Sequence, residues 1–280
     1  MVPPMIDQND QKASDSKGAP DSKGTEGDDT YSFGFEDVTG QEKTKRVRSV
    51  FSSVASSYDV MNDAMSLGVH RLWKSAMMDW LSPRPGMQVL DVAGGTGDIA
   101  TRILQRANRD LKPDQAPAHV TVCDINEAMV SEGRDRALNN CRMDGVNWVC
   151  GNAEALPAQS AAYDAYTIAF GIRNVTHIDQ ALCEAYRVLK PGGRFMCLEF
   201  SMPEAELLQK PYDFYSFKII PLLGGAIAGD RESYQYLVES IRQFPKPDAF
   251  SDMIKAAGLS RVEHRTMSAG LVTLHSARRI

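Results

Sequence analysis

Residues 89–98 read VLDVAGGTGD, and this stretch predicts how the chain folds. An apolar run, a glycine-rich turn and a helical pattern from Asp98 are typical of a buried strand that leads directly into a helix. Glycines in such a turn let backbone N–H groups approach a ligand closely, and the helix N-terminus adds a partial positive charge. The turn alone leaves the ligand open, because Gly95-x-Gly97-x-x-Ala100 also satisfies the fingerprint of dinucleotide-binding proteins.

Beyond this turn, short apolar runs alternate with helical patterns. The helical pattern of Ile178–Leu189 is ended by residues 190–193, which read KPGG. We expect seven strands, at residues 88–93, 119–124, 146–150, 165–170, 194–200, 260–266 and 271–276. The alternation predicts an α/β, doubly wound parallel sheet with helices on both faces, and the last two strands are expected to form a terminal hairpin.

Two amphipathic helices are expected before the first strand. Apolar residues recur every three or four positions from Glu42, and a second such stripe precedes Ser82 and Pro83. The second stripe consists of Leu72, Trp73, Ala76, Met77 and Trp80. Another helical stretch, rich in aromatic residues, is expected just before the last two strands. We expect these helical segments, at about 42–81 and 203–244, to act as lid elements over the ligand site.

The N-terminal segment differs in composition from the rest of the chain. Residues 7–30 hold seven acidic residues against three lysines, and no Val, Leu, Ile or aromatic residue. Such a segment buries too little apolar surface to offset the entropy of ordering, so we expect residues 1–32 to be a disordered acidic tail and residues 33–280 to form one domain. The tail carries most of the net charge of −5. A body so close to neutral argues against a nucleic-acid-binding protein.

Several other classes of protein are disfavoured by residue usage. The five cysteines never form a Cys-x-x-Cys pair and the five histidines lack metal spacing, so we expect neither a disulfide framework nor a metal site. The longest apolar run, residues 219–228, contains a proline and two glycines and is too short to cross a bilayer. No arginine precedes Arg46, and the acid-rich start is unlike a mitochondrial presequence.

The ends of the second and third predicted strands carry polar groups that suit an adenosyl ligand. Asp124 ends the second strand, 27 residues past Gly97. In an open sheet such an acid lies beside the crevice where the strand order reverses, and it can accept both hydroxyls of a ribose. Asn152 and Ala153 follow the third strand, where a side-chain amide and a backbone N–H could pair with the edge of an adenine. Three successive strand ends therefore predict one adenosyl site.

These motifs resemble a known class of enzyme. Residues 91–98, Asp124, residues 152–157 and residues 189–193 look like the ordered motifs of class I S-adenosylmethionine-dependent methyltransferases, whose fold is a Rossmann-like seven-stranded sheet. A narrower resemblance, to the ubiquinone/menaquinone biosynthesis C-methyltransferase family, runs from about Phe33 to Ile280 and is most similar to the mitochondrial ubiquinone branch. It rests on the stretches YDVMND at 58–63, LGVHRLWK at 67–74, FGIRNV at 170–175 and SYQYLVESI at 233–241.

The resemblance implies a cofactor, a substrate and partners. The cofactor is S-adenosylmethionine, and the residues implied to bind it are Asp91, Gly94, Gly95, Thr96, Gly97, Asp124, Asn152 and Ala153. Some relatives carry Asp at the position of Asn152, but an amide can also accept from the adenine amino group. The implied reaction methylates a ring carbon of 2-methoxy-6-polyprenyl-1,4-benzoquinol in ubiquinone biosynthesis. The resemblance also suggests a homodimer, membership of a multi-protein coenzyme Q biosynthesis complex, and peripheral attachment to the matrix side of the mitochondrial inner membrane.

Arg173 and Asn174 follow the fourth strand and are the expected catalytic pair. The acceptor ring reacts far better as its phenolate, and ionising a phenol at pH 7 costs about 4 kcal/mol. Holding an arginine neutral at pH 7 would cost at least about 7 kcal/mol, so Arg173 is expected to stabilise the phenolate or to orient a water that removes the proton. The alternative is a structural ion pair. His177 is either a proton acceptor or, more simply, a helix cap.

Alternatives remain open at this point. The apolar cluster within residues 212–223 could cover the polyprenyl chain and contact the membrane, or it could pack in the core or a dimer interface. The glycine spacing also fits a NAD- or FAD-dependent oxidoreductase of Rossmann type. A catalytically idle scaffold within a quinone-synthesis assembly is the third possibility, although the set of Asp91, Thr96, Asp124 and Arg173 argues against it.

Overall fold

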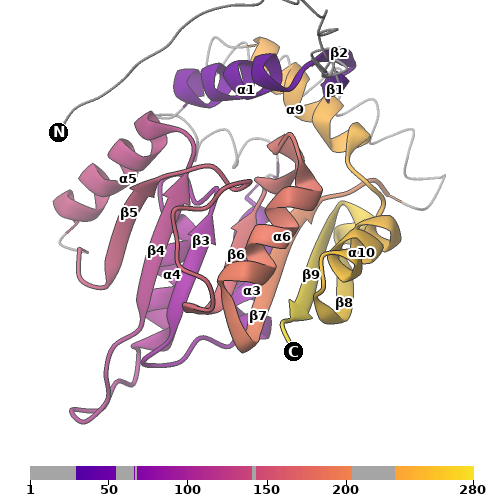
Figure 1. Ribbon diagram of the computed structural model, residues 1–280. Helices are drawn as coiled ribbons and strands as arrows, with labels where there is room; N and C mark the ends of the chain where they lie inside the picture. The colour runs from indigo at the N-terminus through magenta and orange to yellow at the C-terminus, as the bar shows by residue number, and fades with distance from the viewer. Residues whose placement is uncertain (1–29, 55–65, 67, 141–142, 204–230) are drawn as a thin grey trace, which may run out of the picture.

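The computed structural model describes residues 30–54, 66, 68–140, 143–203 and 231–280. Its centre is a seven-stranded sheet in the order β5-β4-β3-β6-β7-β9-β8, which confirms the predicted fold (Figure 1). The strands are β3 (Gln88–Val92), β4 (His119–Asp124), β5 (Val146–Cys150), β6 (Tyr163–Ala169), β7 (Leu189–Phe200), β8 (Ser260–Met267) and β9 (Val272–Arg278). The first five are parallel, and β9 runs antiparallel between β7 and β8.

Strand β3 is the point where the strand order reverses. From β3 the chain adds β4 and β5 on one side, and then crosses to add β6 and β7 on the other side. Connections that leave β3 in opposite directions open a crevice at the carboxyl ends of the strands, which is where open α/β sheets bind ligands. The glycine-rich turn that follows β3 lies at this crevice.

Helices cover both faces of the sheet. On one face α3 (His70–Leu81) and α4 (Asp98–Ala107) pack on β3, β4 and β7. On the other face α6 (Ile178–Val188) packs on β6 and β7, and α10 (Pro247–Ala256) packs against α6, β8 and β9. Helix α5 (Glu127–Asn139) lies along β4 and β5. Both faces of the sheet are therefore apolar, which explains why its strands read as continuous hydrophobic runs.

The buried face of α3 differs from the predicted stripe. Leu72 was expected to point into the core, but it is 69% exposed. The buried face instead consists of His70, Trp73, Lys74, Met77, Met78 and Leu81. These residues recur every three or four positions, as expected for one face of a helix. Two of them, His70 and Lys74, are polar, so a search for apolar residues does not detect them. Lys74 is stabilised there by an ion pair with Asp98, 2.8 Å away.

An N-terminal hairpin was not predicted. Strands β1 (Thr30–Phe33) and β2 (Glu36–Thr39) pair antiparallel and lead into α1 (Gly40–Val54). Strand β1 therefore begins within the predicted tail of residues 1–32, and residues 1–29 lie outside the described residues. Figure 1 shows α1, the hairpin and α9 (Arg231–Gln243) across the carboxyl-end edge of the sheet. Strands of four residues with so few inward side chains give almost no periodic signal.

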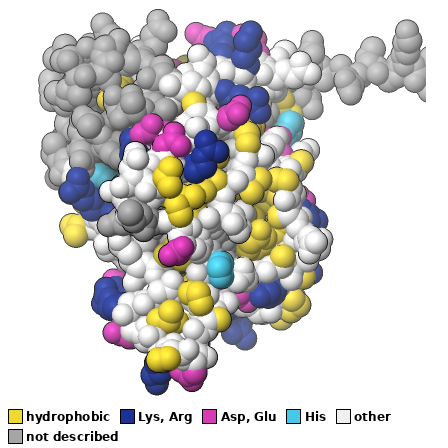
Figure 2. Space-filling view, turned by 90° about the vertical axis from the view of Figure 1, so that its left-hand side faces the viewer, with side chains coloured by type: hydrophobic (Ala, Val, Ile, Leu, Met, Phe, Trp, Pro, Cys, Tyr) yellow, Lys and Arg dark blue, Asp and Glu magenta, His cyan; other side chains and the backbone are white. Residues whose placement is uncertain are grey.

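Other predictions can be checked only in the part of the chain that is described. There, no helix could cross a membrane and no group of acidic, histidine and cysteine side chains could hold a metal ion. The apolar cluster within residues 212–223 lies outside it. On the face over α5 and β5, side chains of both charge signs are interspersed with hydrophobic ones (Figure 2). The described residues of that face do not form one continuous basic patch.

Candidate active site

The carboxyl ends of β3, β4 and β6 open into a cavity, called the main cavity below. The sheet and its following loops line it with Val92, Ala93, Gly95, Asp124, Ile125, Asn126, Met129, Gly151, Asn152, Ala153, Glu154, Phe170, Gly171, Asn174, Val175 and Thr176. Helix α1 closes it from above with Thr44, Val47, Arg48 and Phe51. Gly95, Asp124, Asn152 and Ala153 thus meet here, as predicted.

Asp124 is held in the cavity wall by two backbone donors. Its Oδ2 accepts from the N–H of Gly95 at 2.9 Å, and its Oδ1 accepts from the N–H of Asn126 at 2.9 Å. Burial raises the pKa of Asp124, and these backbone hydrogen bonds oppose that rise. Each carboxylate oxygen has a second lone pair, so Asp124 can still accept from two ligand hydroxyls.

Asp91 lies behind the glycine turn rather than in the cavity wall. It is 1% exposed. Its Oδ1 accepts from Thr167 Oγ1 at 2.7 Å, whereas Oδ2 is buried and has no partner among the described residues. Burial raises the pKa of Asp91 to about 7. A Cβ at Gly94 would lie 2.8 Å from Asp91 Oδ2, so only glycine lets the turn pass this carboxyl group.

Thr96 and Gly97 do not line the main cavity. They line a second cavity, beside α4 and α5, together with Arg102, Arg136 and other residues. Gly97 has a φ of 79°, and a Cβ on it would lie 2.5 Å from Trp148. Close packing against Trp148 is thus a sufficient reason for glycine at this position.

Asn152 closes a short turn at the cavity wall. Its Oδ1 accepts from the backbone N–H of Glu154 at 3.1 Å, which leaves the second lone pair of that oxygen available. The adjacent Ala153 is buried. The turn presents this loop to the cavity next to Asp124, as the sequence predicted.

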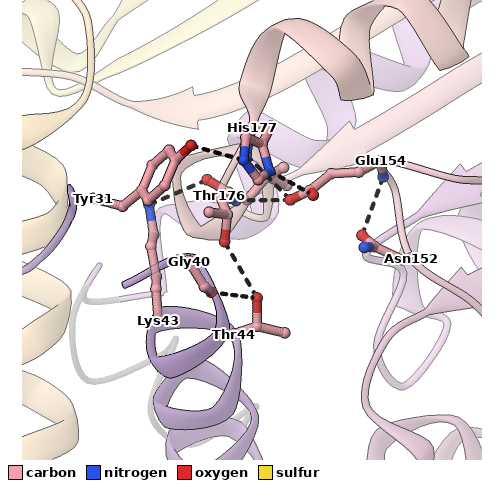
Figure 3. Close-up of polar contacts among 9 residues, drawn as sticks. Tyr31, Gly40, Lys43, Thr44, Asn152, Glu154, Thr176 and His177 are labelled. Atoms are coloured by element: carbon pink, nitrogen blue, oxygen red, sulfur yellow. Dashed lines mark hydrogen bonds and ion pairs between the residues drawn. The ribbon is translucent and has the colours of Figure 1, made fainter. Parts of the chain in front are cut away.

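Glu154 and His177 connect this loop to the N-terminal hairpin. His177 Nδ1 lies 2.8 Å from Glu154 Oε2, and its Nε2 lies 2.8 Å from the hydroxyl of Tyr31 on β1 (Figure 3). Glu154 Oε1 also accepts from the backbone N–H groups of Thr176 and His177. His177 occupies the position before α6 but its side chain does not cap that helix. The prediction that the His177 side chain caps the helix was therefore wrong.

Polar contacts fix helix α1 over the cavity. Its Lys43 donates to the backbone carbonyl of Val175 at 3.2 Å (Figure 3). Asn126, which caps α5 through its Oδ1, donates from Nδ2 to the carbonyl of Arg48 at 3.0 Å. Sequence reasoning missed Asn126, although an asparagine before a helical pattern is a common cap signal.

Arg173 and Asn174 lie in a short 3-10 turn, Ile172–Asn174, after β6. The side chain of Arg173 is 3% exposed and forms an ion pair with Glu199, Nη1 to Oε1 at 2.7 Å. Its Nε is buried and has no acceptor among the described residues. Arg173 itself does not line the main cavity, whereas Asn174 does. The ion pair that we considered as the alternative is therefore present.

Asn174 has a partner on α9. Its Oδ1 accepts a hydrogen bond from the hydroxyl of Tyr236 at 3.0 Å. Tyr236 is 6% exposed, and burial raises its pKa above the ordinary value for tyrosine. Sequence reasoning gave Tyr236 no role, because nothing local indicates that α9 returns to this turn.

The fold and the site define a class I S-adenosylmethionine-dependent methyltransferase. Residues 38–279 match the ubiE/COQ5 methyltransferase family, and the chain belongs to that family. The nicotinamide or flavin alternative is not favoured, and neither is the idle scaffold.

Curated relatives agree over most of the chain. The ubiquinone/menaquinone biosynthesis C-methyltransferase UbiE of Ruegeria sp. is 55% identical over 253 residues, which cover 90% of this chain and 98% of that protein. The protein of the same name from Brucella abortus is 54% identical over 261 residues, 92% of this chain and 94% of its own. These relatives are bacterial and do not support the predicted mitochondrial location.

Solved structures show the same fold at low identity. The Haemonchus contortus phosphoethanolamine N-methyltransferase 2 in complex with S-adenosylmethionine gives a TM-score of 0.54 at 14% identity, over 74% of this chain and 52% of that one. A Haloferax volcanii methyltransferase, solved with its Trm112 activator, gives a TM-score of 0.57 at 17% identity, over 83% of this chain and 97% of that one.

Proposed function

We propose that the protein transfers a methyl group from S-adenosylmethionine to a ring carbon of 2-methoxy-6-polyprenyl-1,4-benzoquinol. The product is 2-methoxy-5-methyl-6-polyprenyl-1,4-benzoquinol, and the step belongs to ubiquinone biosynthesis. The curated relatives are named as ubiquinone/menaquinone biosynthesis C-methyltransferases, which supports a quinone-class substrate. The observation that carries the proposal is one cavity lined both by Asp124, which suits a ribose, and by Asn174, which suits a phenolic oxygen.

The residues present fit the cofactor. Asp124 would accept from the ribose hydroxyls, and Asn152 with the N–H of Ala153 would pair with the adenine. The buried Oδ2 of Asp91 lacks a partner among the described residues, and the cofactor's ammonium group would satisfy such a carboxylate. Gly94 and Gly95 complete the proposed set as the part of the turn that brings backbone close to the ligand, and Thr96 and Gly97, which line the second cavity, are proposed to act by shaping that turn. When bound, the cofactor supplies an already activated methyl group on a sulfonium.

The catalytic pair is proposed to favour the phenolate form of the acceptor. Asn174 Nδ2 has no acceptor within the described part of the chain and borders the cavity, so it would donate to the phenolic oxygen. Arg173 shares its charge with Glu199, so we assign its unpartnered Nε to orienting a water that accepts the phenol proton. Hydrogen bonds to a charged oxygen contribute about 1.5–3 kcal/mol each, a large part of the roughly 4 kcal/mol needed.

The remaining proposals follow from the family resemblance. An apolar wall with Val47, Phe51 and Phe170 suits the tail of a polyprenyl quinol where it joins the ring. The cluster within residues 212–223 is proposed to hold the rest of the tail and to rest on a membrane. A homodimer, membership of a coenzyme Q biosynthesis complex, and peripheral attachment to the matrix side of the inner membrane stay proposals.

Two measurements test the proposed function. The first is calorimetric titration of the full chain with S-adenosylmethionine and, separately, with NAD. The second is incubation with methyl-labelled cofactor and a short-tailed 2-methoxy-6-polyprenyl quinol, followed by mass spectrometry of the quinol. We expect cofactor binding and one methyl group on a ring carbon. Binding without transfer would indicate the idle scaffold, and binding of NAD alone would contradict the assignment.

A further inference from the structure

We propose that Tyr236 is a positioning residue for methyl transfer, because its hydroxyl orients the amide of Asn174 so that Nδ2 faces the acceptor. The inference rests on the proposed function and adds a residue from α9 to it. Tyr236 touches neither substrate nor cofactor in this scheme. It acts through Asn174.

The direction of the hydrogen bond carries the argument. An asparagine amide has one accepting end and one donating end, and either end can face the cavity. The hydroxyl of Tyr236 donates to Oδ1 at 3.0 Å, so Oδ1 is directed toward α9. The other end, Nδ2, then remains for the main cavity, which Asn174 lines. A donor at that place would stabilise a phenolate, whereas the carbonyl oxygen would repel it.

Tyr236 remains a donor at every pH at which the enzyme would work. Its hydroxyl is buried, and burial raises its pKa above the ordinary value for a phenol. Two charged groups face it, Arg173 from the turn after β6 and Glu199 from β7, and they oppose each other. The guanidinium of Arg46 lies 5.4 Å from the ring centre of Phe33, which stacks on Tyr236. Oppositely charged neighbours leave the phenol neutral.

The N-terminal hairpin holds Tyr236 in place. The ring of Phe33 stacks on the ring of Tyr236, with centroids 4.2 Å apart and planes 16° apart. The backbone N–H of Phe35 donates to Glu239 Oε2 at 3.2 Å, one helical turn further along α9. Such a stacked pair limits rotation of the phenol about its Cα–Cβ bond. The hairpin thus contributes to the orientation of an amide that is far away in sequence.

The test is Tyr236→Phe in the full chain, with kcat and KM measured for both substrates from pH 6 to pH 10. We expect kcat at neutral pH to fall about tenfold, KM for S-adenosylmethionine to stay unchanged, and the acid limb of the kcat profile to move to higher pH. The acid limb moves because a less well oriented Asn174 amide stabilises the phenolate less, which raises the pKa of the bound quinol. Tyr186→Phe, which removes a hydroxyl on α6, is the matched control and should behave as wild type.

A double-mutant cycle separates positioning from a structural role. If Tyr236 acts through Asn174, Tyr236→Phe should have no further effect on kcat once Asn174→Ala is present. Additive losses, or a loss equal at every pH, would overturn the inference, and so would a wild-type profile for Tyr236→Phe. If that variant unfolds, Phe33→Leu replaces it with the same expected shift. A wild-type enzyme that fails to methylate the quinol contradicts the proposed function instead, and the inference with it.

Discussion

Asp124 and Gly95 hold each other in place: the carboxylate Oδ2 accepts from the backbone N–H of Gly95 at 2.9 Å. The acid at the end of β4 therefore fixes the glycine turn that follows β3, and both border the same cavity. One side chain thus has two tasks, ordering the turn and offering its remaining lone pairs to a ligand.

Replacing Asp124 with Asn should weaken cofactor binding much more than folding. The amide keeps one acceptor but loses the charge, so a hydrogen bond worth about 1.5–3 kcal/mol is weakened and Kd should rise roughly 10- to 150-fold. Calorimetry with S-adenosylmethionine measures this. Asp135→Asn on the exposed face of α5 is the control. A Kd within twofold of wild type would remove Asp124 from the proposed ribose site.

The buried carboxyl of Asp91 predicts a pH dependence of stability. Its pKa is raised from 3.8 to about 7, so between these values the folded protein keeps a proton that the unfolded chain releases. The free energy of unfolding should therefore fall as pH rises through this window, by up to about 4 kcal/mol. In urea denaturation from pH 4.5 to pH 8, the free energy of unfolding of Asp91→Asn should increase relative to that of wild type as the pH rises. A constant difference between the two would contradict the prediction.

The same carboxyl predicts how cofactor affinity depends on pH. If Asp91 pairs with the cofactor's ammonium group, binding requires its ionised form, and the affinity should increase as pH rises through about 7. Calorimetry at pH 6 and pH 8 should show that increase for wild type and lose it for Asp91→Asn. If the affinity of wild type and of Asp91→Asn depended on pH in the same way, the cofactor's ammonium group would not pair with Asp91.

Gly97 is expected to be required for packing. Gly97→Ala would bring a Cβ to within 2.5 Å of the rigid ring of Trp148. Gly192→Ala is a close control, because Gly192 also has a positive φ, of 81°, but nothing lies within 4 Å of its added Cβ. Both variants carry the strain of a positive φ, so the difference between their free energies of unfolding isolates the clash. We expect Gly97→Ala to be less stable by about 1–3 kcal/mol, and equal values would disprove the packing role.

Arg173→Met should destabilise the fold as well as slow catalysis. It leaves Glu199 buried without its cation, which typically costs about 3–5 kcal/mol. Adding Glu199→Leu should restore most of that stability but not the turnover. Denaturation midpoints of the single and double variants test the predicted stabilities, and their initial rates test the predicted loss of turnover. A single variant as stable as wild type would show that the ion pair is dispensable for folding.

Local patterns in the sequence predicted the sheet well. The turn at Gly94–Gly97 and the apolar runs indicated all seven strands of the large sheet. The parallel strands were clear because strands buried on both faces read as continuous hydrophobic runs. Strand β7, however, begins at Leu189 rather than at the predicted Arg194, so residues 190–193, which were expected only to end the preceding helix, belong to the strand. Asp124 and Asn152 could be placed because strand ends meet at one edge. Their positions depend only on the order of elements.

Contacts between distant segments could not be predicted in this way. Tyr236 and Glu199 come close to the turn at residues 172–174 only after the chain has folded, and neither has a local signal. Leu72 is exposed while Lys74 is buried and paired with Asp98, and a hydrophobicity pattern predicts the opposite for both side chains. Thr96 and Gly97 match the motif as well as Gly95 does, yet the turn directs them to the other side.

The hairpin's attachments imply an order of assembly. The cradle around Asp124 closes across 29 residues of chain, whereas Tyr31 and Phe35 reach His177 and Glu239 across 146 and 204 residues. Closing long loops is slower than closing short ones. During refolding, the part of the site around Asp124, proposed to hold the nucleoside, can therefore form first. The part proposed to receive the quinol forms later, because it requires contacts between segments that are far apart in the chain.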